Sequence, residues 1–205
     1  METPEQKLRR VLAEAVGVVS YDPRWPDRFR AEADHLRACL PADLVVRIEH
    51  FGSTAVPGLA AKPVVDILVE VTSLAETRRR IAPLLEAQGY DYFWRPTHGD
   101  DEPPFYAWFI KRDPSTGERT HHIHMVEAGF GEHWDRLRLR DHLIAHPEVA
   151  AEYAALKRRL AAESPGDRVA YARGKREFLD RVTELAKREQ GRGPSAGDAR
   201  RRSGV

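Results

Sequence analysis

A carboxylate within an apolar stretch is the first feature of this sequence that indicates chemistry. Asp66 lies in the segment 64–71, whose other residues are apolar except Glu70. Because the burial of an unpaired charge is costly, we expect Asp66 to have a partner, such as a cation, a metal ion or a hydrogen-bond donor. Upstream, Gly52 lacks a Cβ atom and would let backbone N–H groups approach a ligand closely, and Ser53 adds a hydroxyl.

Two histidines form the second feature. Along the segment 120–126, His122 and His124 alternate with Ile123 and Met125. Side chains alternate between the two faces of a strand, so the histidines share one face and the apolar pair shares the other. If the apolar pair faces the helices, the histidines point to the side that we expect Asp66 to face. Such a pair can bind a metal ion, bind phosphate as imidazolium, or form a solvated polar surface.

The remaining patterns predict the elements that position these residues. Short β-rich segments bounded by turn residues predict strands, at 44–51, 64–71, 90–94, 105–111 and 120–126. Apolar residues spaced by three and four predict helices, at 3–15, 25–40 and 72–88, and from 131 onward with a break at His146-Pro147. Ser73 and Glu76 have the spacing of a capping box at the start of the third helix, and Gly89 ends it.

These elements predict an α+β fold. We expect a mixed, mostly antiparallel sheet of about four or five strands, covered by helices on one face. The segments 105–111 and 120–126 should form an antiparallel hairpin. The open face of the sheet would carry the candidate site, which consists of Gly52, Ser53, Asp66, His122 and His124.

A lysine in the last predicted helix is a further candidate. Its apolar stripe consists of Tyr171, Phe178, Val182 and Leu185, and Lys175 falls on the same stripe. The lysine can extend its amine outward to solvent, or reach a phosphate in the cleft. For the domains we predict an N-terminal helix in residues 1–16, one domain in 17–189 and a disordered basic tail in 190–205.

Composition narrows the classes of function. The 33 Lys and Arg residues nearly balance 32 Asp and Glu residues, giving a formal charge of +1. This balance argues against a dedicated nucleic-acid binder, which usually has a basic excess. Cys39 is the one cysteine, and the sequence has neither a long apolar run nor a leader pattern. We therefore expect a cytoplasmic protein that acts on a small molecule without a membrane; the sequence leaves its oligomeric state open.

Longer runs of the sequence resemble a known family, the GrpB family. The runs are Tyr21 to Pro26, Glu49-His50, Thr54 to Leu59, Lys62-Pro63, His121 to His124, His146-Pro147 with Tyr153 and Leu156-Lys157, and Tyr171 with Lys175 and Phe178. The resemblance covers roughly residues 17 to 185. More broadly, Gly-Ser followed by a strand Asp resembles the nucleotidyltransferase superfamily, in which the Gly-Ser turn holds the triphosphate and strand carboxylates hold magnesium. GrpB domains also occur fused behind dephospho-CoA kinases.

The sequence departs from the superfamily pattern at two positions. Active nucleotidyltransferases usually carry Asp-x-Asp or Asp-x-Glu on that strand, and here Leu68 stands at the second position. Glu70 would lie roughly 7 Å from Asp66 at the rise of a strand, which is too far for a simple replacement. His124 stands near the position at which the superfamily often has a third carboxylate.

The resemblance implies an enzyme that transfers a nucleotidyl group from ATP or another NTP to a small acceptor. Asp66, His122 and His124 would hold Mg²⁺ or another divalent metal, with Asp66 and His124 in catalytic roles. The phosphates would be held by Gly52, Ser53, Lys62 and Lys175. The alternative is a module of the same fold without catalysis, which binds a nucleotide or a phosphorylated metabolite or assists a partner enzyme.

Overall fold

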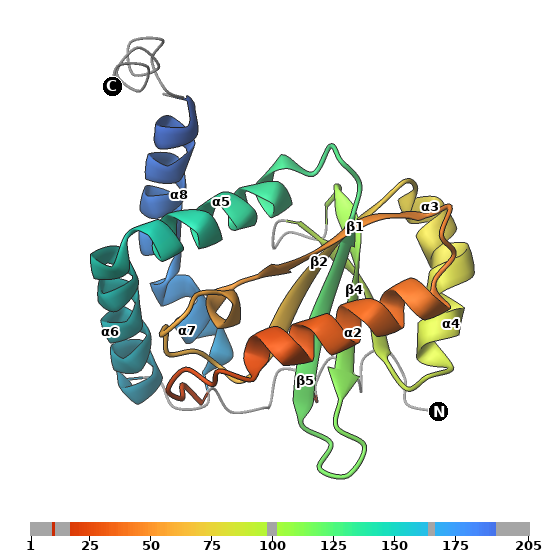
Figure 1. Cartoon of the computed structure of the whole chain (residues 1–205), viewed down its shortest axis with the longest axis horizontal. Helices are drawn as coiled ribbons and strands as arrows, with labels where there is room; N and C mark the ends of the chain where they lie inside the picture. The colour runs from red at the N-terminus through yellow and green to blue at the C-terminus, as the bar shows by residue number, and fades with distance from the viewer. Residues whose placement is uncertain (1–9, 11–16, 98–101, 164–166, 192–205) are drawn as a thin grey trace, which may run out of the picture.

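The computed structural model describes residue 10 and residues 17–97, 102–163 and 167–191 (Figure 1). The predicted N-terminal helix and the predicted tail lie outside the described residues, except for Arg10 and the end of the last helix. The elements are α2 (Trp25–Cys39), β1 (Val45–Phe51), η1 (Ser53–Ala55), β2 (Val65–Val71), α3 (Leu74–Glu76), η2 (Thr77–Ile81), α4 (Ala82–Glu86), β3 (Asp91–Pro96), β4 (Phe105–Arg112), β5 (Arg119–Val126), α5 (Gly131–Ala145), α6 (Pro147–Glu163), α7 (Arg168–Gly174) and α8 (Arg176–Gly191).

A five-stranded mixed sheet forms the centre of the fold. The strand order is β1-β2-β5-β4-β3, in which β2 and β5 pair in parallel and the other neighbours pair antiparallel. The parallel pair sets Asp66 opposite His122 and Leu68 opposite His124. The α+β class, the mostly antiparallel sheet and the β4–β5 hairpin that the sequence predicts are therefore confirmed.

One face of the sheet packs against helices and forms the main core. Alternate residues of the central strands point to this face and are fully buried, namely Ile67, Val69, Ile123 and Met125. The helices α2, α3 and α4 and the turn η2 supply the other side of the core, including Trp25, Leu36, Ile81 and Leu85. Figure 1 shows α2 lying along this face, with α3 and α4 beside the sheet at one end. Apolar burial of this kind is the main source of stability.

The opposite face of the sheet is covered only in part. There, Trp134 and Leu137 of α5 pack against a second apolar cluster formed by Phe51, Leu68, Tyr106, Trp108, Ile110 and Val126. The helices α6, α7 and α8 stand beyond one end of the sheet (Figure 1). Residues of α5, α6 and α8 form a further apolar cluster, the C-terminal cluster, which includes Leu143, Tyr153, Phe178 and Val182. The C-terminal helices therefore bound the face on which we expected the site.

Two predicted helices are divided in the structure. The helix expected at 72–88 starts with the predicted cap, since Oγ of Ser73 accepts a hydrogen bond from the N–H of Glu76 at 3.2 Å. It then widens into the π-helical turn η2 ahead of Pro83, which has no N–H to donate to the preceding turn. The last helix breaks at Lys175, and Leu185 of α8 is 40% exposed, so the predicted apolar stripe is wrong at Leu185.

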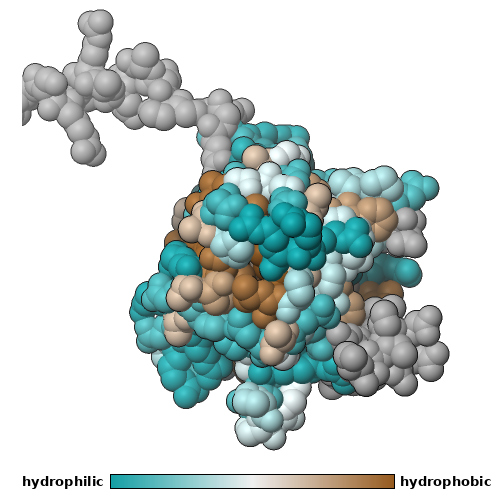
Figure 2. Space-filling view, turned by 90° about the vertical axis from the view of Figure 1, so that its right-hand side faces the viewer, coloured by the Kyte–Doolittle hydropathy of each residue, from teal (hydrophilic) through white to brown (hydrophobic). Residues whose placement is uncertain are grey.

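Hydrophilic residues predominate on the face drawn in Figure 2. Figure 2 shows one side of the molecule, where hydrophobic residues gather in a band among hydrophilic ones. Among the described helices, none has the length and apolar character needed to cross a lipid bilayer.

Candidate functional site

The Gly-Ser turn lies directly against Asp66. Gly52 follows β1 with a φ of 73°, in the left-handed region that favours glycine. A Cβ atom at this position would lie 2.5 Å from Oδ2 of Asp66, which is closer than real Cβ atoms approach. Gly52 is therefore required both by its backbone conformation and by the closeness of the carboxylate. Ser53 comes next and begins the 3₁₀ turn η1.

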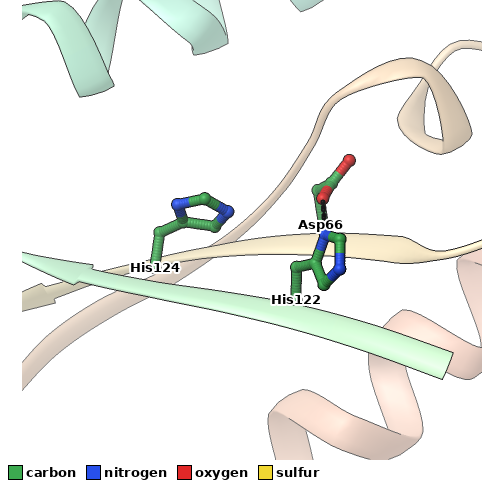
Figure 3. Close-up of side chains that lie close together, drawn as sticks. All are labelled: Asp66, His122 and His124. Atoms are coloured by element: carbon green, nitrogen blue, oxygen red, sulfur yellow. Dashed lines mark hydrogen bonds and ion pairs between the residues drawn. The ribbon is translucent and has the colours of Figure 1, made fainter. Parts of the chain in front are cut away.

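Asp66 and His122 form a pair across the parallel strands. Nδ1 of His122 lies 3.1 Å from Oδ1 of Asp66 (Figure 3). On its other side, Nε2 of His122 lies 3.5 Å from the guanidinium of Arg119, which donates to it, so Nδ1–H donates to Asp66. Burial lowers the pKa of His122, although the hydrogen bond to Asp66 opposes this shift. The ring is therefore neutral at pH 7.

His124 rises from the same side of β5 as His122 (Figure 3). It is 8% exposed and lies between aromatic rings, stacked on Tyr106 at 5.5 Å and edge-on to Phe51 at 5.3 Å. Burial, followed by the charge of Arg136, lowers the pKa of His124 well below its usual value. Among the described residues, Nδ1 of His124 has no hydrogen-bond partner. A neutral imidazole with an unpaired nitrogen can serve as a metal ligand.

At the two positions of β2 where a second carboxylate was considered, Leu68 and Glu70 make contacts away from Asp66. Leu68 is fully buried in the second apolar cluster, so this position of β2 offers no carboxylate to the site. Glu70 instead accepts a hydrogen bond from Arg47 at 2.6 Å. Because both residues are already engaged, Asp66 is the one carboxylate that β2 contributes to the site.

A buried lysine joins the Gly-Ser turn to the C-terminal helices. Lys157 of α6 is 2% exposed, and its Nζ donates to Oγ of Ser53 at 3.0 Å and to the carbonyl oxygen of Ala60. The amine also lies 4.5 Å from the centre of the Tyr153 ring. Burial, followed by the nearby charge of Lys175, lowers the pKa of Lys157 to about 7. An anion bound beside this amine would restore its charge.

Two adjoining cavities meet at Asp66. One has a volume of about 880 Å³, and the other, of about 550 Å³, shares Ser53, Asp66 and His122 with it. Within the described parts of the chain, Asp66 is the one carboxylate that lines either cavity. The cations that line the larger cavity are Lys62, Arg95, Arg119, Lys157, Arg173, Lys175 and Arg176. The smaller cavity adds Arg136 and Arg140. This excess of positive charge suits a ligand with several negative charges.

The structure brings all the residues of the predicted site to these cavities. Asp66, His122 and His124 offer ligand atoms within 4.8 Å of one another. Lys62 and Lys175 line the same cavity as Ser53 and Asp66. Lys175 sits at the break between α7 and α8, its amine 4.3 Å from the centre of the Tyr171 ring, and not within a continuous helix as expected. That these residues bind metal and phosphate stays a prediction.

Several contributors to the cavities were not assigned to the site by the sequence. Lys157 follows Tyr153 by four residues on the inward stripe of its helix, and a cation on such a stripe was the available signal. We predicted a site lysine from this signal at Lys175, whereas the buried amine belongs to Lys157. Arg95 and Arg136 carried no such signal, because only the packing of β3 and α5 brings them to Asp66.

The ligand atoms of this site indicate which metal ions it suits. One carboxylate and two neutral imidazoles suit divalent transition metals such as Mn²⁺, Fe²⁺ or Zn²⁺. A metal ion would have to displace the Nδ1 proton that His122 donates to Asp66, and the 3.1 Å between these two atoms is then close to the spacing of two ligands of one ion. Magnesium prefers oxygen and retains waters, so Asp66 together with substrate phosphates would hold it. The residues therefore fit a divalent metal ion.

Comparison with known proteins identifies the family. The sequence pattern of the GrpB protein family matches residues 15–185, and the chain belongs to this family. It is similar to a UPF0157 protein of Pseudomonas aeruginosa, with 41% identity over 82% of this chain and 66% of that protein. It is also similar to the crystal structure of GrpB from Enterococcus faecalis, with 30% identity and a TM-score of 0.73 over 85% of this chain and 99% of that one. The expected mixed sheet followed by C-terminal helices is thereby confirmed as the fold of this family, and its likeness to the nucleotidyltransferases stays a prediction.

Some relatives are considerably longer than the matched region. The match to the UPF0157 protein YqkA of Bacillus subtilis covers 48% of that protein at 35% identity. A dephospho-CoA kinase of Mycolicibacterium paratuberculosis matches at 30% identity over 80% of this chain and 44% of that enzyme. The GrpB domain therefore occurs both in short chains and as part of longer ones.

Proposed function

We propose that this protein is a metal-dependent nucleotidyltransferase that uses ATP or another NTP and a small acceptor. The observation that carries the proposal is the position of Asp66, which lies against the Gly52–Ser53 turn and opens into cavities lined by cations. Asp66 can hold a metal ion, and the cations around it can hold the phosphates of a polyphosphate that binds the same ion. No nucleic acid or membrane is needed, and the cytoplasm is the compartment that we propose.

Each part of the site has a role in this proposal. Asp66, with His122 and His124, would hold the divalent ion, which offsets negative charge on the phosphates. The turn at Gly52 and Ser53 would direct N–H and hydroxyl donors at the triphosphate. Lys62, Lys157 and Lys175 line one cavity and would neutralise the phosphates.

The smaller cavity suits the acceptor. It is walled by Tyr106 and Trp108, with Arg136 and Arg140 among its charged residues. Aromatic walls with a few charged groups are typical of sites for small molecules. If Asp66 and His122 hold the ion together with the phosphates, His124 would be the base that accepts the proton of an acceptor hydroxyl, because burial keeps its ring neutral and its Nδ1 has no hydrogen-bond partner among the described residues.

A second candidate function is binding without catalysis. The burial of Leu68 favours it, because β2 then offers one carboxylate where active nucleotidyltransferases usually have two. Such a module would bind a nucleotide or phosphorylated metabolite, or assist a partner enzyme. The match to part of a dephospho-CoA kinase supports the partner form of this alternative.

The two functions are separated by measuring binding and transfer on the same samples. ATP binding is measured by calorimetry with Mg²⁺ or Mn²⁺, and label transfer from α-³²P NTPs is measured with pooled small metabolites as acceptors. Transfer that is lost in Asp66→Asn and retained in Glu70→Gln supports the enzyme. Metal-dependent binding without transfer supports the binding module, and the absence of any nucleotide binding contradicts both.

A further inference from the structure

A second cluster of histidine and carboxylate side chains lies outside the cavities described above. His142 is in the last turn of α5, His146 directly follows that helix, and Glu189 is near the end of α8. Figure 1 shows that α5 and α8 run close to one another at this end of the molecule, and Lys187 pairs with Asp135 across them at 2.7 Å. The cluster thus joins two helices that the fold already holds together.

Both imidazoles approach one carboxylate oxygen. Nδ1 of His142 lies 2.9 Å from Oε2 of Glu189, and Nε2 of His146 lies 3.4 Å from the same oxygen. The ligand atoms of the three residues lie within 4.8 Å of one another. Ligand atoms around a tetrahedral metal with bonds of 2.0–2.1 Å are about 3.4 Å apart. The cluster is therefore close to the spacing that a metal ion requires, and small side-chain rotations would complete it.

A fourth residue orients one of the imidazoles. Nδ1 of His146, on the opposite side of the ring from Glu189, lies 3.4 Å from Oε1 of Glu148. Histidines that bind metals commonly donate their other N–H to a carboxylate, which sets the tautomer. With Nδ1–H directed to Glu148, the lone pair of Nε2 faces the point where His142 and Glu189 converge. A simple ion pair needs only one histidine and one carboxylate, so the presence of His146 and Glu148 favours a metal site over an ion pair.

We propose that His142, His146 and Glu189 form a second metal site, which takes a divalent transition metal such as Zn²⁺. Two imidazoles and a carboxylate suit such an ion, and water would fill the remaining position because Glu189 and His146 are open to solvent. The site is structural in character: it connects the end of α5 to α8, the helix whose Phe178 and Val182 pack in the C-terminal cluster. It is independent of the function proposed for Asp66.

Zinc binding to variants tests this site. The full-length protein, without a histidine tag, carries Asp66→Asn so that the other candidate metal site is removed. Binding of Zn²⁺ is measured by competition with a chromophoric chelator, and melting temperature is measured with and without the ion. Glu189→Gln is added in a second variant. The matched control is Glu184→Gln, which removes an exposed carboxylate earlier on the same helix.

We expect the Asp66→Asn protein to bind one equivalent of zinc and to gain about 5 °C in melting temperature at saturating ion. Addition of Glu189→Gln should weaken binding at least about 100-fold and remove the thermal gain, whereas Glu184→Gln should change neither. Addition of Glu148→Gln should weaken binding about tenfold, as the loss of a supporting carboxylate does. The proposal is overturned if Asp66→Asn binds no zinc, or if Glu189→Gln leaves its affinity unchanged.

Discussion

The two faces of the central strands differ in chemistry although the same segments build them. On one face, Ile67 and Ile123 are fully buried beneath α2 and the helices beside it. On the other, their sequence neighbours Asp66 and His122 pair beside a cavity. Because strand side chains alternate, one residue along the chain separates the core from the site. Substitutions on the two faces should therefore have separable effects on stability and on ligand binding.

The largest effect is expected on the core face. Ile123→Ala should lower the free energy of unfolding by about 2–5 kcal/mol, because it removes a fully buried side chain and leaves a cavity. ATP affinity, measured well below the melting temperature, should stay near that of the parent. Urea unfolding and calorimetry check both quantities. A loss of affinity as large as that of a site variant would show that the two faces are coupled.

On the site face, Asp66 should affect ligand binding much more than stability. Asp66→Asn should leave the free energy of unfolding within about 1 kcal/mol, since the side chain is partly exposed and the amide keeps its shape. Metal-dependent ATP affinity should fall at least about 100-fold, which equals about 2.7 kcal/mol. Calorimetry with and without metal measures this difference. Unchanged affinity would contradict the proposed role of Asp66.

Gly52 should affect both the stability of the protein and its affinity for ATP. Gly52→Ala should cost about 1–3 kcal/mol of stability through its backbone conformation and should also displace Asp66. The control is Gly117→Ala, because Gly117 has a φ of 72° and no heavy atom within 4 Å of an added Cβ. Both variants should lose stability, and only Gly52→Ala should lose ATP affinity. Equal affinities in the two variants would separate the turn from the site.

The pH dependence of stability tests the buried amine. The pKa of Lys157 is lowered from 10.5 to about 7, so between these values the folded protein binds fewer protons than the unfolded chain. The contribution of Lys157 to the free energy of unfolding therefore increases as pH rises from about 7 toward 10.5. Urea unfolding at pH 7, 8 and 9 should show that Lys157→Met removes this slope, whereas Lys175→Met should only reduce it, because the charge of Lys175 is a smaller cause of the lowered pKa than burial. A slope that persists in Lys157→Met would indicate another titrating group.

The smallest effect is expected for Lys175 itself. Lys175→Met should reduce ATP affinity about threefold, in the range of a partly exposed charge interaction, and should leave the melting temperature unchanged. Methionine keeps the length of the side chain, so packing beside Tyr171 is retained. Thermal unfolding and calorimetry on the same preparation test this. Lost stability with unchanged affinity would assign Lys175 a structural ion pair.

Local patterns in the sequence were sufficient for the strands and for the main features of the site. The alternation of Ile123 and Met125 with the two histidines fixed which residues share a face, and the structure places them so. The capping residues of α3 and the proline at the start of α6 marked helix boundaries correctly. These signals are readable because they depend on residues near one another in the chain.

Pairing and burial between distant segments required the tertiary structure. The sequence could not place His122 opposite Asp66, because the parallel pairing of β2 and β5 joins strands separated by two other strands in the chain. Likewise, from the sequence we placed only Lys175 on an apolar stripe, although Lys157 also falls on one. Only the packing of α6 against the Gly-Ser turn made Lys157 the buried amine, because desolvation depends on every element that surrounds a group. The sequence by itself determined which side chains could do chemistry, and the tertiary structure decided which of them meet.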